Sequence, residues 1–554
     1  MELEIPEILA VALQAEVGAQ SPLGLQLGGQ GIGSGTRLVS SRHFDSHSLN
    51  LLYRMGQATG ARDLVFQLLA LDNLHGESQV RPILSLESMV PALIEWLGRD
   101  LIDGWLYQRG KDGVLLAWLV HSVRLVNPAE GMAYVVVGLL ANTLPAAGRE
   151  PPAEPRLRFS GMTWGLSFYA EDLPGRTVAG LFADHGFHKE CAEFRREYDM
   201  QLERFTRLQP QFGAQFTISG SAWAPGEGPR AAMTCHRLPT ATAARCVNDE
   251  ELLRRRVDLA ADPHYWRESG IANGFDRIPL HCYLHLFHLE WHRNIWVHAQ
   301  HVQEYQYQPS LRERLVLPQA HRDLVDILTA DRSFLVEDVV PGKSGGTTIL
   351  CRGAPGLGKT LTAEVYAEVV GKPLYRVHSG QLGVTASSVE ASLTQILQRA
   401  ARWDCVLLLD EADVYIRRRD NDLQHNAIVA EFLRTLEYFS GLLFMTTNRL
   451  GDIDEAILSR CIAVIDYQPP DAADARRLWS TLAAQQGIDL PGTLIDTLVV
   501  DYVGASGRDI KELLKLTGKY CRRKGLPMST EAFAHCAVFR GIPCASSRTG
   551  AAAP

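Results

Sequence analysis

The chain has 554 residues, of which 46% are hydrophobic and 21% are charged, as in an ordinary globular protein of several domains. Its 55 Lys and Arg residues against 63 Asp and Glu residues give a formal net charge of -8. This balance argues against a protein that coats nucleic acid without sequence preference, because such binding needs an excess of cations.

The chain also lacks the marks of a membrane or secreted protein. Its most apolar segments, residues 112–126 and 133–141, are shorter than the roughly 20 residues that a membrane-spanning helix needs. The acidic N-terminus has no basic leader of the secretory kind, and the ten cysteines form no CxxC pair. We therefore expect no membrane span and a reduced, cytoplasmic location.

The first part of the chain, residues 1–150, predicts mixed α and β structure. Residues 20–36 are rich in Gly and Ser but do not complete GxGxxG, so a loop is favoured over a dinucleotide site. Apolar residues at helical spacing follow in 50–105, and two or three strands are expected from there to about residue 142. The proline-rich residues 144–155 are interpreted as a linker between domains.

The second part, residues 151–312, predicts a different arrangement. A charged helical segment is expected over 176–208 and a loop over 222–230. Polar and apolar residues alternate over 279–307, which predicts strand–turn–strand. After Pro309 the pattern becomes that of a helix.

Histidines are dense in the strand–turn–strand segment and invite a metal-site hypothesis. His288, Glu290 and His292 stand at alternate positions, which would place them on one face of a strand. A zinc protease of the HExxH type needs Glu directly after the first His on a helix. We therefore interpret the three residues as a polar sheet face rather than as metal ligands.

From residue 347 onward, strands and helices alternate, and the first pair carries a phosphate-binding pattern. Residues 347–364 read TTILCRGAPGLGKTLTAE, a strand that leads through GxxxxGK[ST] into a helix. Backbone N–H groups of such a loop wrap phosphates, Lys359 can bridge the β- and γ-phosphates, and Thr360 can hold Mg²⁺. The predicted nucleotide contacts are Gly353, Ala354, Pro355, Gly356, Leu357, Gly358, Lys359, Thr360 and Leu361.

The next motif is an apolar strand that ends in carboxylates, residues 406–413, with Asp410 and Glu411 at its end. We predict that Asp410 reaches Mg²⁺ through its water shell and that Glu411 acts as the general base. The letters Asp-Glu-Ala-Asp also occur in DEAD-box helicases, but the Ser-Ala-Thr signature of those proteins is missing here. The following strand, GLLFMTTNR, ends at Asn448, whose side chain can orient the attacking water.

Three arginines complete the predicted site. Arg460 ends the run DEAILSR and can reach the γ-phosphate of a neighbouring subunit. Arg508 opens a helix in the C-terminal helical segment and can touch the phosphates of its own subunit. Arg449 is a further candidate phosphate contact.

These motifs occur in the order found in the AAA+ ATPases, and the sequence resembles the classical AAA branch of that superfamily. The similarity is carried by CRGAPGLGKTLTAEVYAE, VLLLDEADV, LLFMTTNRLGDIDEAILSR and GASGRDIKELLK, and it covers roughly residues 313–545. The sequence is similar in particular to AAA proteins of filamentous fungi and some bacteria that have long N-terminal regions. The resemblance implies a ring, usually a hexamer, with ATP bound between subunits.

Two features depart from the pattern of that family. AAA motors carry an aromatic–apolar–Gly loop after the second strand, where it grips substrate in the pore, whereas this chain offers Leu382 and Val384 and no aromatic residue. Those relatives also carry two arginines separated by Pro-Gly, where this chain has Ser459-Arg460-Cys461. Threading of a polypeptide by the usual loop is therefore in question, and Arg460 is left as the candidate finger.

The expected fold is an α/β P-loop NTPase core of the αβα type with a parallel sheet and a small helical lid, preceded by a mixed α+β N-terminal region. The expected function is Mg²⁺-dependent ATP hydrolysis that remodels a macromolecular partner, most simply a protein selected by the N-terminal region. An ATP-controlled assembly switch without threading is the alternative, and a nucleic-acid motor is less favoured. The predicted divisions are 1–150, 151–312, 313–468 for the ATPase core, 469–545 for the lid and 546–554 for a disordered tail.

Overall fold

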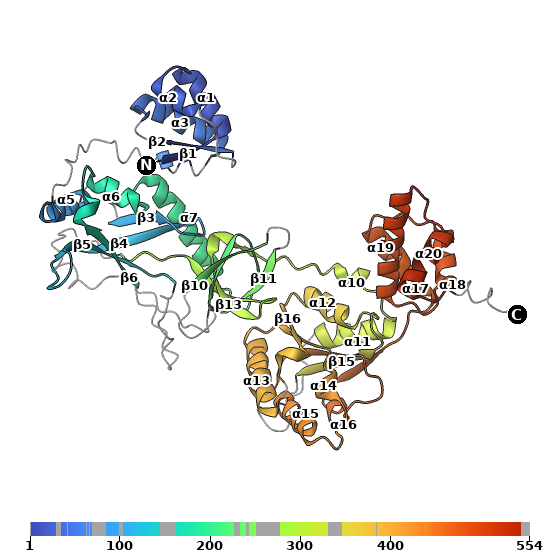
Figure 1. Cartoon of the computed structure of the whole chain (residues 1–554). Coiled ribbons are helices and arrows are strands. Elements are labelled where there is room, and N and C mark those ends of the chain that lie inside the picture. Colours follow the sequence, from blue (N-terminus) through green and yellow to red (C-terminus); the bar gives the residue numbers. More distant parts are fainter. Residues whose placement is uncertain are drawn as a thin grey trace.

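The computed structural model describes residues 2–28, 35–40, 43–61, 64–65, 67–68, 85–98, 104–144, 162–226, 233–239, 243–250, 277–330, 346–383, 385–437 and 439–544. The expected linker at 144–155 lies outside these residues except for its first position, and the expected tail at 546–554 lies wholly outside them. In Figure 1 the chain runs from a small N-terminal unit, through two antiparallel sheets, to a parallel αβα core and a helical lid.

The small N-terminal unit is a two-stranded sheet covered by helices, with its own apolar core that includes Leu3, Leu13 and Leu52. The loop expected over 20–36 is wrong for its first half, because a helix forms there. Ser21 caps that helix by accepting a hydrogen bond from the Gly24 N–H at 2.9 Å, and a proline follows the cap, where it suits a helix start. The elements are β1 (Glu2–Pro6), α1 (Glu7–Val17), α2 (Pro22–Leu27), β2 (Thr36–Ser40) and α3 (Ser46–Thr59).

The second unit is a five-stranded antiparallel sheet in the order β6-β5-β4-β3-β7. Helices pack on both faces: Phe182 joins the cluster on one face and Tyr198 joins the cluster on the other. The predicted helical segment 176–208 is interrupted by a strand, because Gly186 takes a positive φ of 77° and turns the chain. The elements are α5 (Leu86–Gly98), β3 (Trp105–Arg109), β4 (Leu115–Val126), β5 (Tyr134–Ala141), β6 (Met162–Tyr169), α6 (Val178–Asp184), β7 (Phe187–Lys189) and α7 (Ala192–Leu208).

This sheet takes strands from both sides of the boundary that we expected at residue 150. β5 pairs with β6 along its whole length, from Tyr134 opposite Tyr169 to Ala141 opposite Met162. The expected boundary is therefore a poor division, because it would separate two strands that share a hydrogen-bond ladder. The sequence signal there was proline content, which marks a connection and does not distinguish a hairpin loop from a linker.

The third unit is a seven-stranded sheet in the order β10-β9-β13-β12-β11-β8-β14. It contains the predicted strand–turn–strand, as the hairpin of β12 and β13. The loop expected over 222–230 is wrong at its start, because β9 pairs with β10 and meets β13 through Trp223 opposite Trp296. The strands are β8 (Gln215–Ile218), β9 (Ser221–Pro225), β10 (Met233–Arg237), β11 (Ala244–Asn248), β12 (Tyr283–His288), β13 (Arg293–His298) and β14 (Val302–Glu304).

His281 joins the two antiparallel sheets. Its Nε2 lies 2.8 Å from the Ala117 carbonyl oxygen and its Nδ1 lies 2.6 Å from the Thr143 hydroxyl. The carbonyl can only accept, so Nε2 carries the proton and Nδ1 accepts from Thr143. Burial lowers the pKa of His281 to about 4, although Ala117 and Asp112 oppose the shift.

Because the pKa of His281 is lowered, we expect the folded protein to lose stability in mild acid. The unfolded chain takes up a proton near pH 6.5 and the folded chain does not, so stability is full above that pH and falls as the pH drops toward 4. We expect His281 to account for about 2 kcal/mol of lost unfolding free energy between pH 7 and pH 5. Urea unfolding of the wild type and of His281→Gln at both pH values measures this share, and equal losses in the two proteins would contradict it.

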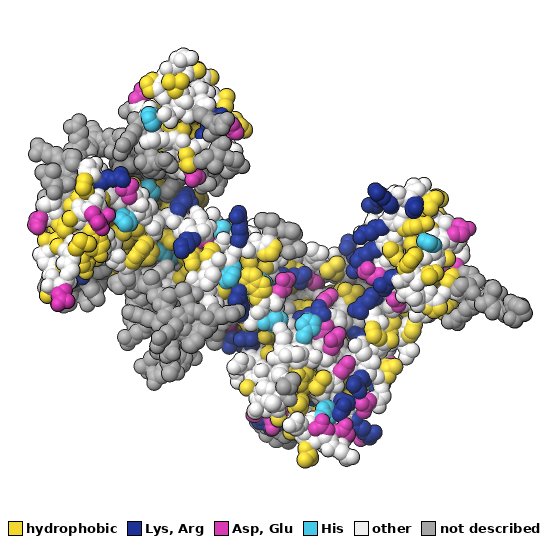
Figure 2. All heavy atoms as spheres, viewed as in Figure 1, with side chains coloured by type: hydrophobic (Ala, Val, Ile, Leu, Met, Phe, Trp, Pro, Cys, Tyr) yellow, Lys and Arg dark blue, Asp and Glu magenta, His cyan; other side chains and the backbone are white. Residues whose placement is uncertain are grey.

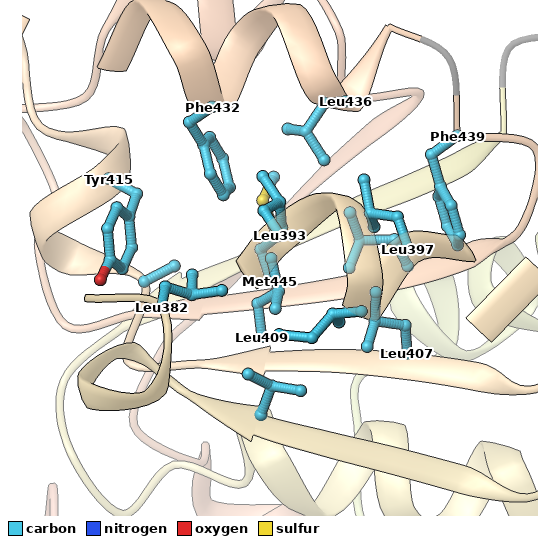
Figure 3. Close-up of a cluster of buried hydrophobic side chains, with 14 of the residues drawn as sticks. Leu382, Leu393, Leu397, Leu407, Leu409, Tyr415, Phe432, Leu436, Phe439 and Met445 are labelled. Carbon is cyan, nitrogen blue, oxygen red and sulfur yellow. The ribbon is translucent and has the colours of Figure 1, made fainter. Parts of the chain in front are cut away.

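The predicted ATPase core is a parallel sheet in the order β16-β17-β18-β15-β19, with helices on both faces. Figure 3 shows one face, where side chains of α13 and α15 meet those of the central strands, with Leu393, Leu409, Phe432 and Met445 among them. The opposite face packs against α11 and α12. The elements are α10 (Leu311–Arg314), α11 (Gln319–Ala330), β15 (Thr347–Gly353), α12 (Lys359–Val370), β16 (Leu374–His378), α13 (Ala386–Arg402), β17 (Val406–Asp410), α14 (Asp413–Ile416), α15 (Leu423–Leu436), β18 (Leu442–Thr447), α16 (Glu455–Leu458) and β19 (Ala463–Tyr467).

The predicted helical lid follows the core as four helices around a separate apolar cluster that includes Trp479, Leu514 and Phe533. The lid touches the phosphate loop, because the Arg508 N–H donates to the Gly356 carbonyl oxygen at 3.3 Å. The αβα core with its parallel sheet and lid, and the mixed N-terminal region, confirm the predicted fold class. The lid helices are α17 (Ala472–Gln485), α18 (Gly492–Asp501), α19 (Gly507–Lys524) and α20 (Thr530–Arg540).

The seven-stranded sheet rests on the ATPase core through a small aromatic contact and a buried ion pair. Asp249, which is fully buried, accepts hydrogen bonds from Arg402 and from the Trp403 indole, both at 2.8 Å. The ring of Phe287 lies 5.0 Å from that of Trp403 and 5.6 Å from that of Tyr375. This contact brings the β12–β13 turn to the entrance of the cleft described next.

Candidate functional site

A cleft of 1370 Å³ lies between the ATPase core and the lid. Its walls come from the phosphate loop, from the ends of β16, β17 and β18, from lid helices α17 and α19, and from the N-terminal sheet. Figure 2 shows Lys and Arg side chains gathered along the side of the lid that faces the rest of the molecule. The cleft thus combines a glycine-rich loop with cations and carboxylates, which is a suitable lining for a metal-bound polyphosphate.

The phosphate loop connects β15 to α12 with a backbone that glycine permits. Gly356 and Gly358 have φ values of +82° and +97°, which side-chain-bearing residues rarely adopt. A Cβ at Gly356 would also lie 2.7 Å from the Ser506 hydroxyl of the lid. Either substitution would therefore distort the loop or push the lid away. The predicted residues Pro355 to Leu361 all line the cleft.

Lys359 is the first residue of α12 and is nearly buried. Its Nζ donates to the carbonyl oxygens of Gly353 and Ala354, both at 2.8 Å, and to Asn448 Oδ1 at 2.9 Å. Burial lowers the pKa of this lysine, and nearby carboxylates partly oppose the shift. The structure thereby brings two predicted site residues, Lys359 at the start of α12 and Asn448 directly after β18, into contact.

Asp410 is the last residue of β17 and is bonded to Thr360, the other residue that we predicted to bind the metal ion. Its Oδ1 accepts hydrogen bonds from the hydroxyls of Thr360 at 2.9 Å and Thr446 at 2.6 Å, and its Oδ2 accepts from Arg376 at 2.5 Å. Burial raises the pKa of Asp410, but these donors outweigh it and the net pKa lies below its usual value. The carboxylate and the Thr360 hydroxyl are hard oxygen donors side by side, so the residues present fit Mg²⁺.

Glu411 follows Asp410 with a backbone conformation that is uncommon for glutamate. Its φ is +56°, and its N–H donates to the Thr446 hydroxyl at 3.0 Å. Such a conformation stores strain and is concentrated at functional sites. The turn directs the exposed Glu411 side chain toward the cleft, which it lines together with Asn448. A second carboxylate, Asp413, accepts the Asn448 N–H at 3.2 Å and fixes the end of β18.

The predicted arginines occupy different places. Arg508 lines the cleft from the start of α19. Arg460 donates to the Ala456 carbonyl oxygen at 3.1 Å and lies 3.7 Å from Glu437, and Arg449 pairs with Asp452 at 3.0 Å. Neither Arg460 nor Arg449 is among the described residues that line the cleft of their own chain.

The histidine-rich segment does not form the single polar strand face that we expected. β12 ends at His288, Glu290 lies in the turn, and His292 has a φ of +51°. The described residues contain no group of three His, Cys, Asp or Glu side chains that could hold a metal ion. Polar and apolar residues alternate through the turn between β12 and β13 as well as along the strands. The alternation therefore did not show that the three residues share one strand face. Glu290 and His292 line the cleft between the core and the lid instead, with Arg245 of β11.

The segment that would form a pore loop is partly folded into the core. Leu382 is 1% exposed and packs with Val389 and Tyr415, whose hydroxyl donates to the carbonyl oxygens of Ser379 and Gly383. Val384 lies outside the described residues. Leu382 is thus a core residue and does not offer a grip for substrate.

The sequence predictions missed three residues that organise the site. Arg376 and Thr446 both bond Asp410, and Arg245 enters the cleft from the N-terminal sheet. Thr446 lies two residues before Asn448, near the end of β18. The sequence pattern that indicated Asn448, a polar residue at the end of an apolar strand, could also have indicated Thr446. Arg376 and Arg245 had no motif of their own, and only strand order and sheet docking bring them to the cleft.

Comparison with known proteins identifies the core. Residues 349–468 match the family described as ATPase family associated with various cellular activities. An uncharacterised AAA family ATPase of Sinorhizobium fredii is 35% identical over 131 residues, which are 22% of this chain and 38% of that protein. The ATP-dependent zinc metalloprotease FtsH 3 of Sphaerobacter thermophilus is 28% identical, covering 37% of this chain and 44% of its own length.

Spastin of Naegleria gruberi is also 28% identical, over 38% of this chain and 39% of that protein. The chain thus spans less than half the length of each of these relatives. Among the described residues, no helix is long and apolar enough to cross a membrane. Residues 349–468 are an ATPase domain of the AAA family, within the AAA+ superfamily, and they have the P-loop αβα fold.

Proposed function

We propose that this protein uses Mg²⁺-dependent ATP hydrolysis in an oligomeric ring, of hexameric size, to remodel a protein partner that the N-terminal region selects. The main support is two hydrogen-bonded groups of residues that line a single cleft. Lys359 bonds Asn448, Thr360 bonds Asp410, and Thr446 joins Asp410 to the Glu411 backbone. These are the phosphate, metal and water-activating groups that phosphoryl transfer to water requires.

In the proposed reaction, Glu411 accepts a proton from a water molecule that Asn448 helps to orient. The water oxygen bonds to the γ-phosphorus, the bond from that phosphorus to the β–γ bridging oxygen breaks, and ADP and phosphate leave. Lys359 and Arg508 stabilise the phosphate oxygens by charge. Mg²⁺ held by Thr360 and Asp410 would supply further neutralisation of the β- and γ-phosphates.

The position of Arg460 supports an oligomer. This residue lies outside the cleft of its own chain, near Glu437, where a second copy could meet it. An arginine delivered from another subunit stabilises the charge that develops on the transferred phosphoryl group. A ring would therefore have a complete site only where two copies meet.

Mixing two inactive variants tests this arrangement. We expect Arg460→Ala to lower ATPase activity by about 10²- to 10³-fold while it still binds nucleotide, and Lys359→Ala to lose nucleotide binding. In a mixed oligomer, an intact cleft of the first variant can meet an intact Arg460 of the second. Phosphate release should then rise at least about tenfold above either variant alone. If the mixture stays as inactive as its parts although co-assembly is measured, Arg460 does not act between subunits.

The second candidate function is an ATP-controlled assembly switch that does not thread its partner. The burial of Leu382 favours it, because the described part of the pore segment presents no exposed aromatic or large apolar side chain with which to grip a polypeptide. The Glu411→Gln protein, trapped with ATP in cells, tests both candidates. Mass spectrometry identifies the partners that it retains, and its biological output separates the two functions. A switch keeps its biological output in the trapped state, and a remodelling motor loses it. A cytoplasmic location is part of either proposal.

A further inference from the structure

Arg376 stands in the nucleotide cleft without a role in the reaction described above. It lies on β16, the edge strand of the core sheet, where it pairs with Leu408 of β17. Its Nη2 donates to Asp410 Oδ2 at 2.5 Å, and its Nη1 lies 3.5 Å from Glu364 of α12. The side chain is 41% exposed and lines the cleft, so it is free to change its partner.

The hydrogen bonds at Asp410 show which groups satisfy this carboxylate. Thr360 and Thr446 occupy one carboxylate oxygen, and Arg376 occupies the other. The Asp410 side chain is only 6% exposed, so leaving its charge without a counter-ion would be costly. Arg376 therefore supplies the positive charge that Mg²⁺ would bring to the same carboxylate, and the two cations compete for it.

A second observation separates Arg376 from an ordinary structural ion pair. Its Nε–H is buried and has no hydrogen-bond partner among the described residues. Glu364, its other neighbour, has a pKa raised by burial despite the arginine, so the glutamate is a weaker anchor than Asp410. The guanidinium thus has one donor that neither Asp410 nor Glu364 uses. Its planar fork matches phosphate oxygens.

We propose that Arg376 is an exchangeable cation of the ATP site: it neutralises Asp410 when the site is empty and binds the terminal phosphate of Mg–ATP when the site is filled. This inference rests on the proposed binding of Mg–ATP in the cleft. The guanidinium would leave Asp410 when this carboxylate holds Mg²⁺, and it would then lie near the phosphates that Lys359 binds. The exchange makes metal binding and recognition of the third phosphate depend on each other.

Two variants of Arg376 test the exchange, and one arginine of the same sheet is the control. Arg376→Gln removes the charge, and Arg376→Lys keeps the charge but cannot form a two-pronged contact. Arg352 on β15 also pairs with an aspartate at the end of a neighbouring strand, Asp466, and it does not line the cleft. Arg352→Gln therefore reports the cost of losing a comparable ion pair outside the site.

The first readout is equilibrium binding and does not depend on turnover. Fluorescent ADP and ATP analogues are titrated into each protein over a range of MgCl₂ concentrations. For Arg376→Gln we expect ADP-bound protein to need at least about threefold less Mg²⁺ for half-saturation, since the competing cation is gone. We also expect the preference for ATP over ADP to fall by about tenfold, with Arg376→Lys between the wild type and Arg376→Gln.

The second readout divides kcat from KM in steady-state phosphate release. Loss of a terminal-phosphate contact should lower kcat in Arg376→Gln by more than it raises KM, whereas Arg352→Gln should match the wild type. Unchanged Mg²⁺ dependence and an unchanged ATP-to-ADP preference in Arg376→Gln would overturn the exchange. If the Arg376→Gln protein fails to fold, the Mg²⁺ dependence and the ATP-to-ADP preference are measured on Arg376→Lys instead. Nucleotide binding that survives in Lys359→Ala would instead refute the site itself, so the two failures are distinguishable.

Discussion

Replacing Glu411 with glutamine is expected to lower ATP hydrolysis by about 10²- to 10⁴-fold with little change in ATP affinity. The amide keeps the size of the side chain and the backbone bond to Thr446, but it cannot accept a proton from water. Rapid-quench measurement of phosphate release at saturating Mg–ATP checks the rate, and titration with a fluorescent ATP analogue checks the affinity.

The control for this change is Glu390→Gln. Glu390 lies on α13, pairs with Arg434 at the surface and does not line the cleft. The ATPase activity of the Glu390→Gln protein should equal that of the wild type. A Glu411→Gln protein that hydrolyses ATP within threefold of the wild-type rate would mean that another group activates the water.

Replacing Lys359 with alanine is expected to abolish ATP binding in practice, with an affinity at least about 100-fold weaker. The loss has two physical causes. The ammonium group supplies charge-assisted hydrogen bonds to phosphates, and a buried contact of that kind is worth about 2–5 kcal/mol. Its bonds to Gly353, Ala354 and Asn448 also hold the loop and the end of β18 together.

Equilibrium titration with a fluorescent ATP analogue measures this effect. Lys372→Ala is the matched control, because Lys372 pairs with Asp404 at the surface, beyond the end of the same helix. The control should bind ATP like the wild type, and both variants should unfold at similar temperatures. Near-normal ATP binding by a folded Lys359→Ala protein would place the nucleotide elsewhere.

The core of the site could be predicted because its signals are local. The phosphate loop needs only a strand, a few glycines and a helix in succession, and Asp410, Glu411 and Asn448 stand at the ends of apolar strands. In a parallel sheet these ends meet at one edge, so the contact of Lys359 with Asn448 follows from the topology.

The remainder depended on contacts between distant segments. Arg376 reaches Asp410 only because β16 lies beside β17, and Arg245 reaches the cleft only because the seven-stranded sheet docks through Phe287 and Trp403. In the same way, Gly and Pro in AWAPGEGPR favoured a loop, while Trp223 pairs with Trp296 more than 70 residues away. Local composition contains no information about such partners.

The N-terminal region illustrates the same limit at a larger scale. Its helices and strands follow recognisable patterns, but its two antiparallel sheets are joined by single side chains such as His281 and Tyr198, which bond segments far apart in the chain. How this region selects a partner is a matter of its surface chemistry, which a fold alone does not specify. The proposed partner is therefore best sought with the trapped Glu411→Gln protein.

The most direct test of the proposed mechanism is phosphate release per subunit as a function of protein concentration, followed together with molecular mass. The proposal requires Mg²⁺ and a second copy to complete each site. Specific activity should therefore rise in step with assembly, disappear when Mg²⁺ is chelated, and be absent in dilute monomer. Constant activity per subunit down to monomeric concentrations, or no hydrolysis by the assembled protein, would contradict it.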